Sequence, residues 1–218
     1  QTGNEFLSLE QQRIVAISIA MRSRDGFKVW SLGEPDSPEE ELVRRFFDGI
    51  ERLAPTLVSW NGAGFDLPVL HYRALRHKVQ AHRYWEMGDM DQSYKWNNYI
   101  SRFHWRHVDL MDVLSGFQGR GRVGLDQMSQ LLGFPGKLGL SGEGVWDAHL
   151  QGRSEDIRNY CETDVVNTYL IYLRFELMRG RLTHEEHDRE VEFVRAGLAG
   201  AEKPHLRGYL DAWAKCGS

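Results

Sequence analysis

The chain has 218 residues, of which 41% are hydrophobic and 11% aromatic, so it can bury the core of one large or two small domains. Its 27 Lys and Arg stand against 31 Asp and Glu, which excludes a nucleic-acid binder that acts through overall positive charge. No run of about 18 apolar residues and no signal-peptide pattern occurs, so we expect a soluble, cytoplasmic protein. Cys161 and Cys216 form neither a zinc set nor a disulfide framework, and we expect reduced thiols.

The first third of the chain alternates predicted strands with predicted helices. β-Branched runs indicate strands, while Ser37 as a cap followed by Pro38 and three acids indicates a helix start. This alternation is typical of an α/β sheet with helical crossovers. The expected elements are a strand over 13–21, a hairpin strand over 27–32, a helix to about residue 53, a strand over 56–60 and a helix over 66–77.

Residues 79–107 form an irregular segment that is rich in aromatic side chains. Between His71 and His107 the chain has seven Lys or Arg against three acids. One interpretation is a flap whose rings stack on bases while cations meet phosphates. The other is an insertion that folds on its own aromatic cluster, and the sequence does not separate the two.

The second half is predicted to be helical, with two glycine-rich loops. The loop over 116–124 carries Arg120 and Arg122, for which exposure to solvent is the simpler interpretation and phosphate binding the alternative. Ser154 is expected to cap a long helix that Gly180 ends. The other expected elements are a helix or strand over 108–114, helices over 125–132, 145–150 and 184–198, a linker over 135–144 and a last turn over 204–213.

Asp66 lies where a predicted strand gives way to a loop and then to a helix. Asn61, Gly62 and Gly64 break the strand, and Pro68 stands in the first turn of the following helix, where a missing N–H costs nothing. A helix N-cap is the simpler interpretation of such an aspartate. The functional interpretation is one half of a metal site.

Tyr160 and Asp164 supply the other half of this candidate site. They are four residues apart in a strongly helical segment, so the phenol and the carboxylate share one face. Hydrolysis of phosphodiesters by paired metal ions needs hard oxygen ligands from separate elements, as Asp66 and Asp164 would provide. A core tyrosine and a surface carboxylate are the simpler interpretations of Tyr160 and Asp164.

Two motifs resemble those of a known superfamily. The sequence NGAGFD ends at Asp66 and is similar to the second motif of DEDD 3′–5′ exonucleases, while YCETD, ending at Asp164, is similar to the third motif of their DEDDy form. The wider segments resemble bacterial predicted 3′–5′ exonucleases related to the proofreading domain of family B DNA polymerases. These segments are LVSWNGAGFDLPVLHY (57–72), WRHVDLMDVL (105–114), LGFPGK (132–137) and NYCETDVVNTYLIYL (159–173).

The resemblance implies a ribonuclease H-like fold and a reaction. Two Mg²⁺ or Mn²⁺ ions would activate a water that attacks the terminal phosphodiester of a single-stranded DNA or RNA 3′ end, releasing nucleoside monophosphates. It further implies that Asp164 binds the catalytic ion, that Asp66 binds the second ion largely through water, and that Tyr160 orients the water. Asn61 and Phe65 would line the substrate cleft.

The first motif of that superfamily, an Asp-x-Glu pair on the first strand, does not occur before Arg13. Only Glu5 and Glu10 are acidic there, without that spacing. Two explanations compete: a segment upstream of Gln1 supplies the pair, or the protein has lost catalysis. We favour the first, because the surroundings of Asp66 and Asp164 are intact.

The predicted fold class is therefore α/β, a ribonuclease H-like mixed sheet flanked by helices. We expect an exonuclease domain over 1–180 with an insertion at about 79–107, followed by a helical extension over 181–218. The alternative function is a catalytically inactive nucleic-acid-binding or scaffold module. A small-molecule hydrolase is disfavoured by the aromatic insertion.

Overall fold

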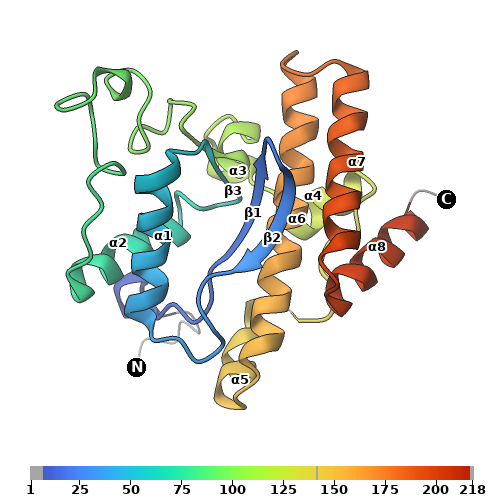
Figure 1. Ribbon diagram of the computed structural model, residues 1–218, viewed down its shortest axis with the longest axis horizontal. Coiled ribbons are helices and arrows are strands. Elements are labelled where there is room, and N and C mark those ends of the chain that lie inside the picture. Colours follow the sequence, from blue (N-terminus) through green and yellow to red (C-terminus); the bar gives the residue numbers. More distant parts are fainter. Residues whose placement is uncertain (1–6, 141, 217–218) are drawn as a thin grey trace. The chain divides into compact units, whose positions relative to one another are not determined.

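The computed structural model describes residues 7–140 and 142–216 (Figure 1). The chain is of mixed α/β class, as the sequence predicts, with helices and two small sheets. It divides into two compact units, each built from two stretches of the chain. The first unit comprises 1–15 and 36–121, and the second comprises 16–35 and 122–218.

In the first unit, a short parallel sheet is formed by β3 (Leu57–Ser59) and β4 (His107–Asp109). The helix α2 (Asp66–His77) follows β3, and α1 (Glu39–Leu53) packs against α2. The short helix α3 (Leu110–Leu114) continues directly from β4. The remaining elements of this unit are the 3₁₀ turns η1 (Leu9–Gln11), η2 (Gln92–Tyr94) and η3 (Gly119–Gly121).

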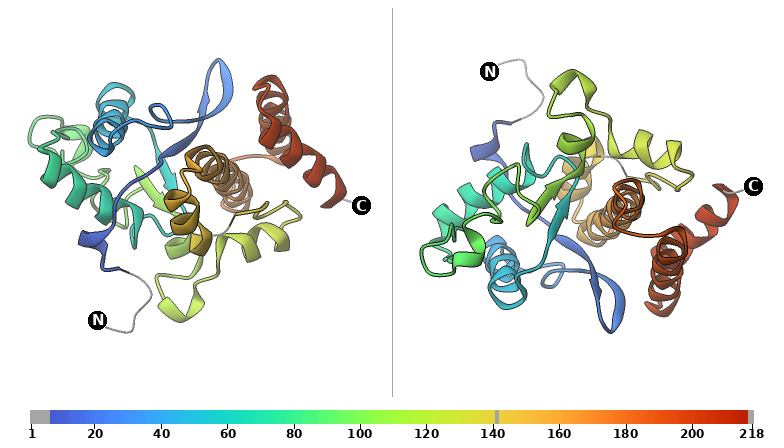
Figure 2. Two further views of the ribbon diagram at one scale, coloured as in Figure 1. Left: turned by 90° about the horizontal axis from the view of Figure 1, so that it is seen from below. Right: turned by 90° about the horizontal axis from the view of Figure 1, so that it is seen from above.

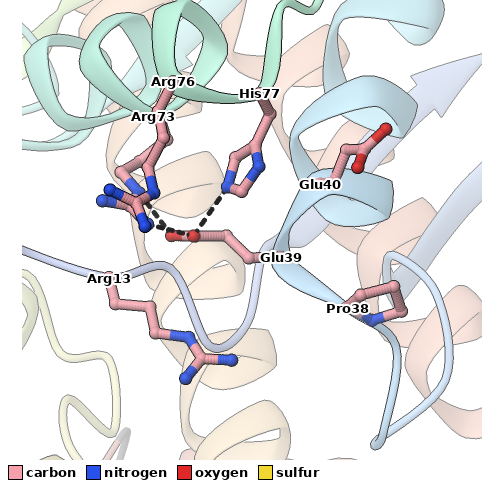
Figure 3. Close-up of a pocket in the computed structure, with 7 residues that line it drawn as sticks. All are labelled: Arg13, Pro38, Glu39, Glu40, Arg73, Arg76 and His77. Carbon is pink, nitrogen blue, oxygen red and sulfur yellow. Dashed lines mark hydrogen bonds and ion pairs between the residues drawn. The ribbon is translucent and has the colours of Figure 1, made fainter.

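The buried carboxylate of Glu39, in the first turn of α1, connects several segments of this unit. Its carboxylate accepts hydrogen bonds from the Ile14 N–H and Arg73 Nε, each at 2.7 Å, and lies 2.8 Å from His77 Nε2. Figure 3 shows these side chains around a pocket of about 340 Å³ that Arg13 and Arg76 also line. One carboxylate thus joins α1, α2 and the segment before β1.

The insertion over 79–107 is held by its own aromatic cluster. The rings of Tyr84 and Tyr99 stack with centroids 5.5 Å apart, and Phe47 of α1 meets Tyr84 edge-on at 5.5 Å. Tyr94 is buried beside them, with the Arg106 guanidinium 3.9 Å from its ring centroid. The second sequence interpretation therefore holds for these three tyrosines, while other rings of the insertion are exposed.

In the second unit, β1 (Ser18–Ser23) and β2 (Gly26–Ser31) form an antiparallel hairpin. The long helix α6 (Ser154–Met178) and α7 (His184–Gly200) pack on this hairpin. Close approach needs a glycine at Gly197, because a Cβ there would collide with the Phe27 carbonyl. The other elements are α4 (Leu125–Leu131), η4 (Gly142–Gly144), α5 (Val145–Leu150) and α8 (Pro204–Cys216).

The C-terminal helix α8 lies against α6 and α7, at the red end of the ribbon in Figure 2. Glu162 of α6 is buried and accepts hydrogen bonds from Lys203 Nζ at 2.8 Å and from Ser31 Oγ at 2.9 Å. His205 Nε2 lies 2.8 Å from the same carboxylate. This one side chain joins α6 to the hairpin and to the start of α8.

Three sequence expectations about element ends were wrong. The first strand begins at Ser18 instead of residue 13, because the Ile14 N–H bonds to the Glu39 side chain and not to a strand. Ser154 is the first residue of α6 and makes no cap; Arg153 holds the cap position. Pro38, and not Ser37, occupies the N-cap position of α1.

The C-terminal stretch forms a full helix where a final turn was expected. None of the helices in the described part of the chain is long and apolar enough to cross a membrane.

Candidate functional site

The turn between β3 and α2 is shaped by backbone requirements that the sequence meets locally. Asn61 adopts a left-handed φ of 62°, and its carbonyl accepts the N–H groups of Gly64 at 3.1 Å and Phe65 at 3.0 Å. A Cβ on Gly62 would collide with the Ser59 hydroxyl, and one on Gly64 would lie 2.6 Å from Asn61 Oδ1. The turn is therefore tight, and Gly62 is required by space, whereas a side chain at Gly64 would displace the Asn61 amide.

Asp109 holds this turn from the end of the neighbouring strand. Its Oδ1 accepts the Asn61 N–H and its Oδ2 accepts the Ala63 N–H, both at 2.9 Å. The same carboxylate accepts the N–H of Met111 at 3.1 Å and so caps α3. Asp109 thus fixes the loop that ends at Asp66. Sequence reasoning gave it no role, because it left open whether residues 108–114 form a helix or a strand.

A buried histidine, His107, packs next to the same turn. His107 Nε2 lies 2.8 Å from Ser59 Oγ, in hydrogen-bond distance across β3 and β4. Burial lowers the pKa of His107, so its imidazole is neutral at physiological pH. The pair fills the space directly behind the turn.

The structure brings three of the predicted site residues together in the first unit. Asn61 and Phe65 are half-buried within the turn, and Asp66 is exposed as the first residue of α2. Asp66 does not occupy the N-cap position, which Phe65 holds, so the simpler interpretation of this aspartate was wrong. Its carboxylate is accessible to a ligand at the N-terminus of the helix.

Tyr160 and Asp164 lie one turn apart on α6 in the second unit, as their spacing predicts. The Tyr160 hydroxyl donates a hydrogen bond to the Asp164 carboxylate. Within the described residues, the buried Asp164 Oδ1 has no hydrogen-bond partner. Leaving a buried carboxylate oxygen without a donor is costly, so a cation bound there would be stabilised.

Burial dominates the electrostatics of this pair. It raises the pKa of Asp164 to about 6, although the hydrogen bond from Tyr160 and the charge of Lys137 act in the opposite direction. The pKa of the Tyr160 phenol is also raised, by burial and then by the neighbouring Asp164 charge. The phenol therefore keeps its proton and can act only as a hydrogen-bond donor toward the carboxylate.

Lys137 is a functional candidate that sequence reasoning missed. Its Nζ lies 5.8 Å from the Tyr160 ring centroid, and its charge lowers the pKa of Asp164. Asp126 of α4 positions this loop by accepting the Lys137 N–H at 2.7 Å. The available signal is the segment LGFPGK, which contains this lysine and resembles the exonuclease family.

A chain of hydrogen bonds holds the other side of the same loop. Asn167 Nδ2 of α6 donates to the Gly136 carbonyl at 2.9 Å, and the Tyr209 hydroxyl of α8 donates to Asn167 Oδ1 at 2.6 Å. All three groups are buried or enclosed between helices. The C-terminal helix therefore takes part in placing Lys137.

A metal ion at Asp164 fits the donor chemistry of this position. Its free oxygen is a hard, acceptor-only ligand of the kind that Mg²⁺ and Mn²⁺ prefer. Asp66 offers a second carboxylate of the same chemistry, which is exposed. In the part of the chain described, no three His, Cys, Asp or Glu side chains group together to hold an ion.

Comparison with known proteins agrees with these features. No curated protein matches the chain. A family model described as a predicted 3′–5′ exonuclease related to the exonuclease domain of PolB matches residues 4–213, which is nearly the whole chain. The match extends over both units, the turn at Asp66 and the helix that carries Tyr160 and Asp164. The chain therefore belongs to this family of predicted 3′–5′ exonucleases.

Proposed function

We propose that the protein is a metal-dependent 3′–5′ exonuclease that hydrolyses single-stranded DNA or RNA from the 3′ end to nucleoside monophosphates. The observation that carries the proposal is the buried Asp164 oxygen that lacks a donor, beside the hydroxyl of Tyr160. Two Mg²⁺ or Mn²⁺ ions would supply electrostatic stabilisation of the attacking and leaving oxygens.

Each proposed site residue has a distinct task. Asp164 would hold the catalytic ion through its free oxygen, and Asp66 would hold the second ion largely through water. Tyr160 would orient the attacking water with its protonated hydroxyl. Asn61 and Phe65 would line the cleft for the terminal nucleotide from the turn before α2.

Lys137 adds a positive charge near Tyr160 and Asp164. Such a charge would stabilise the negative charge that develops on the phosphoryl oxygens during attack. Asp109 would act only by positioning, because its carboxylate is taken up by the backbone of the turn and of α3.

The proposal needs an Asp-x-Glu pair on a further strand, and we propose that a segment upstream of Gln1 supplies it. Within the described residues, β1 pairs only with β2 and β3 pairs only with β4, which leaves one edge of each strand open for addition. The apolar side chains of β1 and β3 are only half-buried, in keeping with a missing neighbour.

The test is cleavage of a 5′-labelled single-stranded oligonucleotide by the full-length protein with Mn²⁺. We expect a ladder shortened from the 3′ end, no cleavage in EDTA, and loss of cleavage in Asp164→Asn and Asp66→Asn. Glu155→Gln, an exposed carboxylate on the same helix as Asp164, is the matched control and should cleave normally. An intact oligonucleotide at high enzyme concentration, or full activity in either Asp variant, would refute the proposal.

A catalytically inactive nucleic-acid-binding module is the second candidate. The exposed rings of the insertion with their neighbouring cations favour it, because binding through them needs no metal ion. Under this proposal the full-length protein binds the oligonucleotide with and without Mn²⁺ and leaves its length unchanged.

A further inference from the structure

Some aromatic rings of the insertion over 79–107 are exposed and lie outside its buried cluster. Trp96 is 78% exposed and Phe103 is 70% exposed, while Tyr84, Tyr94 and Tyr99 are fully buried. Exposing large rings to water is unfavourable, and exposed apolar groups with polar neighbours commonly mark an interaction site. The insertion therefore divides its rings between a core and a surface.

The two most exposed rings each have a cation beside them. Lys95 Nζ lies 5.6 Å from the Trp96 ring centroid, and the Arg102 guanidinium lies 5.8 Å from that of Phe103. The same guanidinium is 4.7 Å from the ring of Phe117, which meets Phe103 edge-on at 5.2 Å. Each of these two rings is thus paired with a positive charge.

Hydrogen bonds close the segment that presents these groups. The Trp105 N–H donates to Asn97 Oδ1 and the Asn98 N–H donates to His104 Nδ1, each at 3.1 Å. The Arg106 Nε donates to the Asn97 carbonyl at 2.7 Å. The two ends of the loop over 98–104, which carries Phe103, are therefore joined, and Trp96 directly precedes the residues that close it.

The charge of this loop fits an anionic ligand. Residues 95–106 contain Lys95, Arg102 and Arg106 and no acid, although the chain as a whole is acidic. Arg102 makes an ion pair with Asp112 at 3.1 Å, which offsets part of its charge and keeps its guanidinium beside the rings of Phe103 and Phe117, whereas Lys95 has no such acidic partner among the described ion pairs. A polyanion with flat apolar groups matches both features, and single-stranded nucleic acid has this chemistry.

We propose that Lys95, Trp96, Arg102, Phe103 and Phe117 form a stacking surface that binds unpaired nucleotides of a single strand. The bases stack on Trp96 and Phe103, and the adjacent phosphates meet Lys95 and Arg102. The proposal rests on the proposed function for its ligand class, and it places binding on groups that take no part in hydrolysis. Duplexes, whose bases are stacked on each other, bind more weakly to such a surface.

The test is fluorescence anisotropy of a labelled single-stranded oligonucleotide with the full chain in EDTA, where no cleavage occurs. Trp96→Ala and Phe103→Ala should each raise the Kd about tenfold, since stacking on one ring contributes that much. Trp96→Phe should restore most of the affinity because it keeps an aromatic face. Lys95→Ala should weaken binding and reduce its dependence on salt.

Trp146→Ala is the matched control, because Trp146 in α5 is 62% exposed and lies outside the insertion. It should leave the Kd unchanged. An unchanged Kd in both insertion variants, or an equal loss in the control, would overturn the proposal. So would a change from dimer to monomer in light scattering with unchanged oligonucleotide binding, which would assign the surface to a second copy of the chain.

The outcome is separable from that of the proposed function. If wild type cleaves while Trp96→Ala and Phe103→Ala bind normally, the surface proposal fails and the exonuclease stands. If these variants lose binding while wild type never cleaves, the surface stands and the exonuclease fails.

Discussion

The Asp109 carboxylate at the end of β4 accepts a hydrogen bond of 2.9 Å from the backbone N–H of Asn61, just after β3. The two residues are neighbours only through the parallel pairing of the strands, in which Ser59 stands opposite Asp109. Since Asp66 follows five residues after Asn61, this contact sets where the first proposed metal ligand stands.

We therefore expect Asp109→Asn to destabilise the fold by about 2 to 4 kcal/mol, because an amide group cannot accept from all the backbone donors that the carboxylate serves. Urea denaturation measures this loss. In the exonuclease assay the variant should lower kcat more than it changes KM, since the turn is misplaced but its side chains remain. Asp89→Asn, an exposed carboxylate of the same unit, is the control and should behave as wild type.

Asp164→Asn should stabilise the metal-free protein at neutral pH. The pKa of Asp164 is raised to about 6, so its contribution to stability is complete below the unfolded pKa and is lost as the pH rises through about 6. The variant, which carries no charge, should gain up to about 3 kcal/mol at about pH 8 and almost nothing at about pH 4. Thermal melts in EDTA at both pH values measure the difference. An equal gain in stability at the two pH values would contradict the conclusion that the charged Asp164 carboxylate destabilises the metal-free protein.

Lys137→Met should raise the pKa of Asp164 further, because the ammonium now favours the charged carboxylate. Carboxyl ¹³C chemical shifts followed by NMR through a pH titration of the metal-free protein report this directly. Lys215→Met, at the exposed end of α8, should leave the titration unchanged. If both variants titrate like wild type, Lys137 has no electrostatic part in the site.

Glu162→Gln should destabilise the second unit by about 3 kcal/mol near pH 7, because it leaves Lys203 and His205 without their buried partner. Burial raises the pKa of Glu162, but hydrogen bonds from His205, Lys203 and Ser31 outweigh burial and lower it. Stability from this carboxylate is thus present above its unfolded pKa and is lost as the pH falls through the folded value.

The difference between wild type and Glu162→Gln should accordingly shrink in acid. Denaturant unfolding at about pH 7 and at about pH 3 measures it, and hydrogen exchange should show faster exchange in α8 of the variant. A difference that stays constant with pH would show that the carboxylate charge is not the source of the stability.

Tyr160→Phe should slow the exonuclease about 10- to 100-fold, less than Asp164→Asn, because it removes the hydroxyl that orients water but leaves the proposed metal ligand. Single-turnover cleavage rates compare the two. Tyr172→Phe, farther along the same helix, is the control and should keep the wild-type rate. A Tyr160 variant as slow as Asp164→Asn would assign the hydroxyl a larger role than water positioning.

Elements with strong local signals were predicted closely. The helix at Asp66 begins and ends where Pro68 and the apolar period place it, and α6 spans the expected residues. The prediction that a strand begins at residue 13 was wrong, because a distant carboxylate, that of Glu39, accepts a hydrogen bond from the Ile14 N–H. The proposed roles of Asp66, Tyr160 and Asp164 stay predictions, supported by the exposed side chain of Asp66 and by the buried Oδ1 of Asp164, which lacks a donor among the described residues.

The sequence by itself determined the α/β class, the tight turn before Asp66 and the shared face of Tyr160 and Asp164, since each depends on residues a few positions apart. Only the tertiary structure decided that Asp109 holds the turn and that Lys137 faces Tyr160. It also decided which aromatic rings of the insertion are buried. Side-chain spacing along one helix or turn is fixed by local backbone geometry, whereas contacts between distant segments exist only after the chain has packed its core.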